Sequence, residues 1–184
     1  MKHLNHFLGV MPDSATTDQL DRRLALTQKS PGYTGKPRPP ELLHTTLHSI
    51  DPAEGVASAA QVEEIRQAVA AVRFPAFKVT FDRVMSFNTR KESYPFVLTG
   101  STGLQTLHQF HQLLGEVLRS KPWIPVKQRF TPHVTLAYFK ELVPARATQP
   151  VSWTVNEFVL VRSYVGASRY EILDRWPLLA AMAL

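Results

Sequence analysis

The chain has 184 residues, a formal net charge of +6 and 44% hydrophobic residues, which is enough for one buried core, so we expect a single domain over residues 1–184. The absence of cysteine excludes disulfides, thiolate nucleophiles and cysteine-ligated zinc. Because there is neither a signal-peptide pattern nor an apolar run of roughly 18 residues, we expect a soluble cytoplasmic protein; its positive charge suits a polyanionic partner such as RNA or a nucleotide.

The first half of the chain alternates strands with helices. Its predicted elements are a strand over residues 6–10, a helix from Ser14 to about Gln28, a loop over 30–40, a strand over 43–50 and a helix around 62–72. Pro12 and Asp13 supply the turn and cap before the first helix, and Leu20 and Leu24 mark its buried side. Proline and glycine concentrate between residues 30 and 40, a composition that disfavours a helix or a central strand.

The second half adds more strands around one helix. The elements expected there are strands over 77–81 and 96–99 joined by a loop over 86–95, a helix carrying Leu104 to Leu118, a basic connection over 121–129, and strands over 133–139, 153–164 and 170–176, the second interrupted at Asn156-Glu157. Trp153 and Trp176 are expected in the core. The pattern as a whole predicts an α+β fold with mostly antiparallel strands.

Two copies of one short pattern occur, His44-Thr45-Thr46-Leu47 and His133-Val134-Thr135-Leu136. Each lies on a predicted strand that follows a helix and a proline-bearing loop, so we hypothesise two related lobes. Side chains alternate along a strand, so His44 and Thr46 point to one side, as do His133 and Thr135. The separation of 133 − 44 = 89 residues, about half the chain, suits one motif per lobe facing a shared cleft.

Two opposed imidazoles form an acid/base pair, which suits in-line displacement at phosphorus without a metal. A neutral imidazole removes a proton from the attacking water or hydroxyl, and a protonated one donates to the departing ribose oxygen. Threonine hydroxyls can donate hydrogen bonds to the non-bridging phosphate oxygens, where charge accumulates. The predicted catalytic residues are therefore His44, His133, Thr46 and Thr135, with no cofactor.

A metal site is the alternative use of these histidines, because strand alternation could place His48 on the face of His44. Glu41 and Asp51 are the acidic residues that flank the first motif, and the sequence has neither a His-Glu-x-x-His pattern nor an aspartate cluster. We therefore expect no metal. His48 is expected to be a hydrogen-bonded surface residue, and His111 a structural one on the apolar side of its helix.

The chain resembles the two-histidine phosphoesterase superfamily, specifically the bacterial RNA 2′,3′-cyclic phosphodiesterase (2′-5′ RNA ligase-like) family, over nearly its whole length. Besides the two motifs, the resemblance rests on Pro12-Asp13, Pro39-Pro40-Glu41-Leu42-Leu43, Ser86-Phe87 with Pro95-Phe96-Val97-Leu98, Phe130-Thr131-Pro132, Leu160-Val161-Arg162-Ser163, Tyr170-Glu171-Ile172-Leu173 and Trp176-Pro177-Leu178. It implies a bilobal α+β fold in which two pseudo-symmetric lobes of antiparallel sheet line a central cleft, with helices packed outside.

Members of that family open 2′,3′-cyclic phosphates at RNA ends to 2′-phosphomonoesters, and some join RNA halves by the reverse reaction. The resemblance implies that His44 protonates the leaving 3′ oxygen and that His133 activates water, although the residues alone leave these roles interchangeable. The implied partners are RNA ends or nucleotides with a cyclic phosphate, without a membrane, and the protein is expected to be a monomer.

One position departs from the family pattern. Many relatives have an arginine two residues after the second motif, within His-x-Thr-Leu-Ala-Arg, where this chain has Tyr138. A tyrosine stacks on bases or donates a hydrogen bond, but it does not pair with a phosphate as arginine does. Arg90, Lys91 and Arg129 are candidates to replace the arginine, and Phe87 is a candidate for stacking on a nucleobase.

Two other functions use the same residues. One is a phosphodiesterase for small cyclic nucleotides or ADP-ribose cyclic phosphate. The other is an RNA-binding protein without turnover, which would bind RNA with strong salt dependence and release no phosphomonoester.

Overall fold

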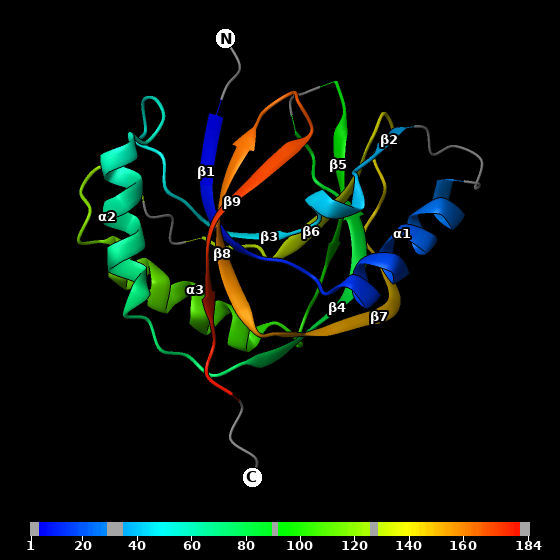
Figure 1. The fold of residues 1–184 in the computed structure, drawn as a ribbon. Coiled ribbons are helices and arrows are strands. Elements are labelled where there is room, and N and C mark those ends of the chain that lie inside the picture. Colours follow the sequence, from blue (N-terminus) through cyan, green and yellow to red (C-terminus); the bar gives the residue numbers. More distant parts are fainter. Residues whose placement is uncertain (1–3, 29–34, 90–91, 126–128, 181–184) are drawn as a thin grey trace.

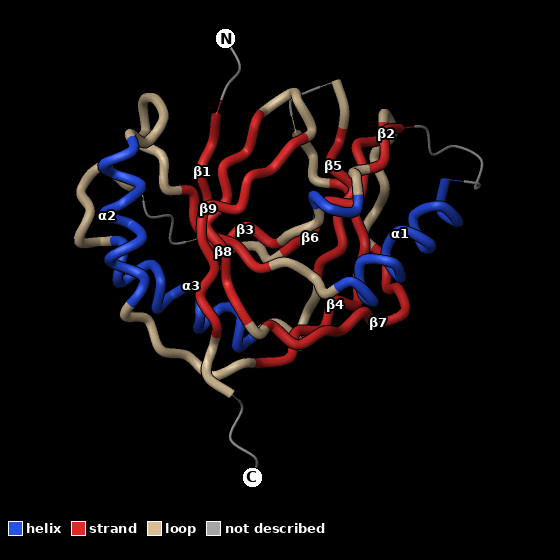
Figure 2. Tube along the Cα trace, viewed as in Figure 1, coloured by secondary structure: helices blue, strands red, loops and turns tan. Residues whose placement is uncertain are grey.

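The computed structural model describes residues 4–28, 35–89, 92–125 and 129–180. Its strands form two antiparallel sheets, a four-stranded first sheet with the order β3-β1-β8-β9 and a five-stranded second sheet with the order β2-β6-β5-β4-β7. Helices flank this pair of sheets, with α1 on one side and α2 and α3 on the other (Figures 1 and 2). The predicted bilobal α+β architecture is therefore confirmed.

The strands and helices have the following bounds. The first sheet contains β1 (Leu4–Val10), β3 (Thr45–Ser49), β8 (Glu157–Tyr164) and β9 (Arg169–Pro177). The second contains β2 (Gly35–Pro37), β4 (Phe77–Ser86), β5 (Tyr94–Thr99), β6 (His133–Phe139) and β7 (Arg146–Val155). The helices are α1 (Ser14–Gln28), α2 (Ala59–Ala70) and α3 (Gln105–Leu118), and a 3₁₀ turn, η1, spans Pro40–Leu42.

Helix starts follow from side-chain caps. Asp13 accepts a hydrogen bond from the backbone N–H of Thr16 at 2.7 Å, which satisfies one free donor at the start of α1. Ser58 and Gln61 form a reciprocal capping box before α2. The apolar residues that predicted the helices, among them Leu20 and Leu24, are buried as expected.

The two lobes repeat one arrangement of elements. In the first, β1 leads through α1 to β3, which pairs antiparallel with β1. In the second, β5 leads through α3 to β6, which pairs antiparallel with β5. The motif strands β3 and β6 contact each other where the lobes meet (Figure 1). This arrangement supports the hypothesis of two related lobes.

Both motif strands carry a β-bulge at the leucine of the motif. Leu8 pairs with His48 and Gly9 with Thr46, so Leu47 is an extra residue in β3. Leu136 is the extra residue in β6, because consecutive residues of β5 pair with Ala137 and then with Thr135. A bulge reverses the alternation of side chains beyond it. The residues before and after each leucine therefore do not share a face.

Two expectations about the elements were wrong. Residues 30–34 of the predicted loop lie outside the described residues, and residues 35–40 contain the short strand β2 and the start of the turn η1. The strand is possible because β2 is at the edge of its sheet, where proline is tolerated. The predicted strand over 153–164 is two strands in different sheets, since β7 ends at Val155 and β8 begins at Glu157. The polar interruption at Asn156 is the point where the chain crosses between lobes.

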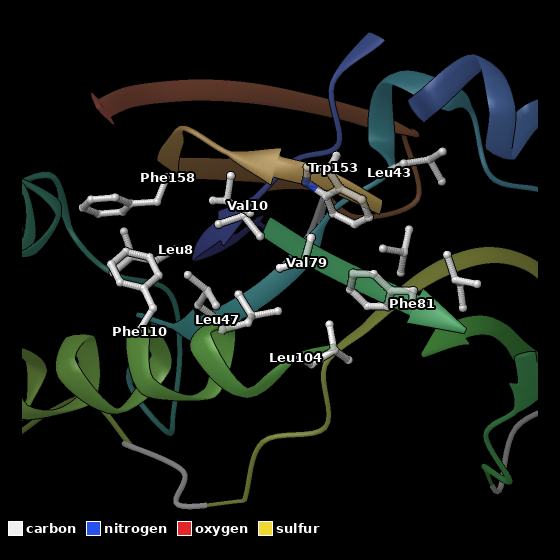
Figure 3. Packing of buried hydrophobic residues seen from close by; sticks show 14 of the residues in the cluster. Leu8, Val10, Leu43, Leu47, Val79, Phe81, Leu104, Phe110, Trp153 and Phe158 are labelled. Carbon is white, nitrogen blue, oxygen red and sulfur yellow. The ribbon is translucent and has the colours of Figure 1, made fainter. Parts of the chain in front are cut away.

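One hydrophobic core extends across both sheets and α3. Figure 3 shows Leu8 and Phe158 of the first sheet packed near Phe110 of α3, and Phe81 beside Trp153 in the second sheet. The rings of Phe81 and Trp153 stack with centroids 5.0 Å apart. Trp153 is therefore a core residue, as predicted. This shared core holds the two motif strands at a fixed spacing.

Candidate active site

His44 lies between η1 and β3, at the point where the first motif enters its sheet. Its Nδ1 donates to the backbone carbonyl of Leu42 at 2.8 Å. A carbonyl only accepts hydrogen bonds, so the proton of the neutral ring is on Nδ1 and Nε2 is the basic nitrogen. Nε2 lies 3.1 Å from the hydroxyl of Thr46. The motif therefore places imidazole and hydroxyl together, as predicted.

His133 begins β6 and repeats this geometry. Its Nδ1 donates to the carbonyl of Thr131 at 2.7 Å, again two residues earlier in the chain. The same tautomer follows, with Nε2 as the nitrogen available for proton transfer. Thr135 is half-buried on β6, like Thr46 on β3. Two short segments far apart in sequence thus orient their imidazoles by the same local hydrogen bond.

Burial lowers the pKa of both imidazoles. Desolvation takes the pKa of His44 down to about 4; the Leu42 carbonyl opposes this shift, while the positive charges of Arg38 and of protonated His133 add to it. The pKa of His133 is also lowered by burial, against the opposing effect of the Thr131 carbonyl. His133 is therefore close enough to affect the protonation of His44, and both rings are neutral at pH 7 in the free protein.

Aromatic rings pack against the two imidazoles. Phe7 of β1 stacks on His44 with centroids 4.7 Å apart, and Tyr170 of β9 meets the same ring edge-on at 5.3 Å. Phe87 meets His133 edge-on at 4.8 Å. Phe87 thus lies beside the second motif, where its predicted stacking on a nucleobase stays a prediction. Sequence reasoning missed Phe7 and Tyr170, which reach the site through pairing of their strands with β8.

An arginine that was not among the predicted binding residues lies beside Tyr138. The guanidinium of Arg38 donates from Nη1 to the Tyr138 hydroxyl at 3.2 Å, from Nε to the Leu42 carbonyl at 3.1 Å, and from Nη2 to the Tyr170 hydroxyl. Tyr170 has its pKa raised by burial, against the lowering effect of Arg38. The available signal was the cation six residues before His44.

The other predicted cations are placed differently. Arg129 is exposed and lies four residues before His133, and none of the described contacts joins it to the motif residues. Arg90 lies outside the described residues. Their proposed role in phosphate binding stays a prediction.

His48 does not share the face of His44, and it is not a surface residue. It is buried, its Nε2 lies 2.8 Å from the carbonyl of His111, and its ring stacks on that of His111 with centroids 4.1 Å apart. The bulge at Leu47 turns His48 away from the cleft, which strand alternation did not anticipate. His111 is buried against Phe130 and serves the structural role predicted for it.

The alternative hypothesis of a metal site required His44 and His48 on one face of the strand, and the structure does not place them there. Across the described part of the chain, no group of three or more His, Cys, Asp or Glu side chains is positioned to hold a metal ion. Within the same ranges, no helix combines the length and hydropathy needed to cross a bilayer.

The fold has the features of the two-histidine phosphoesterase superfamily, because two antiparallel lobes meet and each presents a His-x-Thr-Leu segment there. A family model described as the 2′-5′ RNA ligase superfamily matches residues 14–167, and the chain belongs to this superfamily.

Solved structures with this fold include a phosphoesterase that is 24% identical, with a TM-score of 0.75 over 95% of this chain and 98% of that chain. TT0787 of Thermus thermophilus is 20% identical, with a TM-score of 0.74 over 96% and 98% of the two chains. LigT of E. coli, complexed with 3′-AMP, is 23% identical, with a TM-score of 0.70 over 96% and 98%. Comparison with curated protein sequences gave no match.

Proposed function

We propose that this protein hydrolyses 2′,3′-cyclic phosphates at RNA ends to 2′-phosphomonoesters, without a metal. The observation that carries the proposal is the duplicated imidazole geometry. Both Nδ1 atoms donate to a carbonyl two residues earlier, at 2.8 Å for His44 and 2.7 Å for His133. Each Nε2 is thereby the basic nitrogen, and the pair can accept and donate protons on opposite sides of one phosphate.

In the proposed reaction, Nε2 of neutral His133 takes a proton from water as the water oxygen bonds to phosphorus. The bond from phosphorus to the 3′ oxygen breaks, and protonated His44 gives its Nε2 proton to that oxygen. A 2′-phosphomonoester remains, and the two imidazoles return to their starting states by exchanging protons with solvent. The hydroxyls of Thr46 and Thr135 donate to the non-bridging oxygens in the transition state.

The low pKa of His44 bears on its role as the acid. In the free protein at pH 7 the ring is neutral, because its pKa is about 4. A phosphate anion bound between the rings favours the protonated form, since a nearby negative charge raises the pKa of an imidazole. Substrate binding thus favours uptake of a proton from solvent by His44, and this proton is the one that the leaving oxygen requires. The reverse reaction, joining RNA ends, would use the same groups with exchanged roles.

The test is hydrolysis of an oligoribonucleotide that ends in a 2′,3′-cyclic phosphate, with the product phosphate located on the 2′ or 3′ oxygen. We expect a 2′-phosphate from the wild type and a rate at least about 10³-fold lower in His44→Ala and His133→Ala, because each variant loses one proton-transfer group. Circular dichroism and thermal unfolding verify that both variants fold. Full activity in either folded variant contradicts the proposed mechanism.

The same assay separates the other functions. Faster turnover of a mononucleotide cyclic phosphate or ADP-ribose cyclic phosphate than of the oligonucleotide identifies a small-molecule phosphodiesterase. Salt-sensitive RNA binding without product identifies a binding protein. EDTA should leave the rate unchanged, and restoration of an EDTA-inactivated sample by a divalent ion would establish a metal requirement.

A further inference from the structure

A pocket with a cavity volume of about 330 Å³ lies next to the motif residues, between β2 and the turn that joins β8 to β9. Arg38, Leu42, Tyr138 and Tyr170 form its wall on the side of the site. Because the Tyr170 ring also contacts His44 at 5.3 Å, a single aromatic ring separates the pocket from the first imidazole. The pocket therefore adjoins the first imidazole across the Tyr170 ring.

The charged side chains that line this pocket are all positive. Lys36, Arg38 and Arg169 line it, and none of the described lining residues is acidic. Glu171 lies outside the described lining and accepts hydrogen bonds from the Tyr164 hydroxyl at 2.8 Å and from Arg162 at 3.2 Å, and the charge of Arg169 also lowers its pKa. Cations that converge on a cavity without a carboxylate favour an anionic ligand.

Arg38 is held in place by neutral groups. Its three described hydrogen bonds end on the Leu42 carbonyl and on the hydroxyls of Tyr138 and Tyr170. A guanidinium has five N–H donors, so two remain after these three bonds, one on each Nη nitrogen. The arrangement orients the fork without neutralising its charge, as a phosphate-binding arginine requires.

Tyrosine rings accompany the cations. Tyr138, Tyr164 and Tyr170 line the same pocket, and the guanidinium of Arg169 lies 3.9 Å from the centroid of the Tyr164 ring. Tyr138 is 39% exposed, so its ring is accessible. Aromatic faces next to a track of positive charge form the pattern by which proteins bind single-stranded nucleic acid, with bases on the rings and phosphates on the cations.

We infer that this pocket binds the nucleotide that precedes the reacting end of the RNA. Arg38, Lys36 and Arg169 contact the phosphodiester that joins it to the terminal nucleotide, and its base rests on a tyrosine ring of the wall. The inference rests on the proposed function for the identity of the substrate. It assigns Arg38, which directly follows β2, to phosphate recognition beside Tyr138.

The test compares the binding of two products that need no turnover, adenosine 2′-monophosphate and the dinucleotide ApA carrying a terminal 2′-phosphate, by titration calorimetry. The wild type should bind the dinucleotide at least about tenfold more tightly, since stacking of one base contributes about 1–3 kcal/mol. The additional phosphate should also steepen the salt dependence of log Kd by about 0.7.

The variants K36Q, R169Q and their combination change exposed side chains at the pocket. In the combined variant we expect the preference for the dinucleotide to fall to about threefold or less. Arg119→Gln removes one charge from an exposed position after α3, outside the pocket, and should keep the wild-type preference. If the combined variant has a lower melting temperature than the wild type, the preference for the dinucleotide is compared in the two single variants instead.

Equal affinity of the wild type for the two products overturns the inference, as does a wild-type preference in the combined variant. Hydrolysis of cyclic phosphates is measured separately. Preference for the dinucleotide without hydrolysis of cyclic phosphates would support the inferred pocket and contradict the proposed function. Hydrolysis of cyclic phosphates without preference for the dinucleotide would support the proposed function and contradict the inferred pocket.

Discussion

Arg38 influences His44 through its charge as well as through shared neighbours. Its guanidinium and the imidazole both bond to the Leu42 carbonyl, and the positive charge of Arg38 contributes to lowering the pKa of His44 to about 4. A positive charge near an imidazole opposes its protonation, so the effect disappears with the charge. The protonation of the first imidazole is thus partly set by a residue outside the motif.

Replacement of Arg38 by methionine should therefore raise the pKa of His44 towards 6.5 without reaching it, because burial remains the larger cause of the shift. The measurement is an NMR titration of the His44 ring protons, assigned by comparison with His44→Ala. Arg119→Met, a matched loss of charge at an exposed position, should leave that titration unchanged. A pKa that stays the same or falls in R38M would show that the guanidinium does not act on His44.

At the scale of elements, the bulges explain what could be predicted about the site and what could not. The identities and local geometry of His44, Thr46, His133 and Thr135 follow from the motif itself, because each contact is made within four residues. The position of His48 does not follow, since one extra residue in β3 reverses its face. Phe7 and Tyr170 depend on which strands pair, and no local pattern encodes that pairing.

The sheet to which each strand belongs could not be predicted from local sequence either. The segment from Trp153 to Tyr164 has strand character on both sides of Asn156, with alternation before it and the continuous apolar run 158–161 after it, yet the two parts belong to different lobes. Periodicity reports which face of a strand is buried and says nothing about the sheet that buries it. The fold class was predictable from the motifs and the family resemblance, whereas the crossover was not.

Gly9 lies where β1 meets the bulge of β3. A Cβ at this position would lie 2.9 Å from the backbone oxygen of Thr45 and 3.1 Å from the ring of Phe7, which stacks on His44. Gly9→Ala must therefore displace the strand of the first motif or the ring beside it. We expect a loss of about 1–3 kcal/mol in the free energy of unfolding, together with a reduced rate of cyclic phosphate hydrolysis.

The control is Val69→Ala in α2, which removes a fully buried side chain away from the motifs and lowers the free energy of unfolding by a similar amount. Urea denaturation gives the two stabilities, and single-turnover rates under native conditions give the activities. The steric argument requires G9A to lose more activity than V69A at comparable stability. Equal rates in the two variants would refute it.

At the scale of the whole molecule, histidines buried in the neutral form make stability depend on pH. Burial lowers the pKa of His44 and of His111 to about 4, the charges of His48 and His108 adding to the effect on His111. It also lowers the pKa of His48, with the His111 carbonyl opposing the shift. In the unfolded chain each imidazole has a pKa near ~6.5 and so takes up protons first as the pH falls.

The unfolded state therefore binds more protons than the folded state between pH 6.5 and 4, and the free energy of unfolding must fall as the pH falls through this range. At about pH 8 and above, well past the unfolded-state pKa, these rings are neutral in both states, so their contribution is then complete and constant. His111→Phe keeps a ring between His48 and Phe130 and removes one titrating group. Its unfolding free energy, from urea titrations between pH 8 and 4.5, should decline less steeply with falling pH than that of the wild type. A wild-type slope in H111F would mean that His111 takes up no proton on unfolding, and the acid sensitivity would then have to come from the other buried histidines or from the carboxylates.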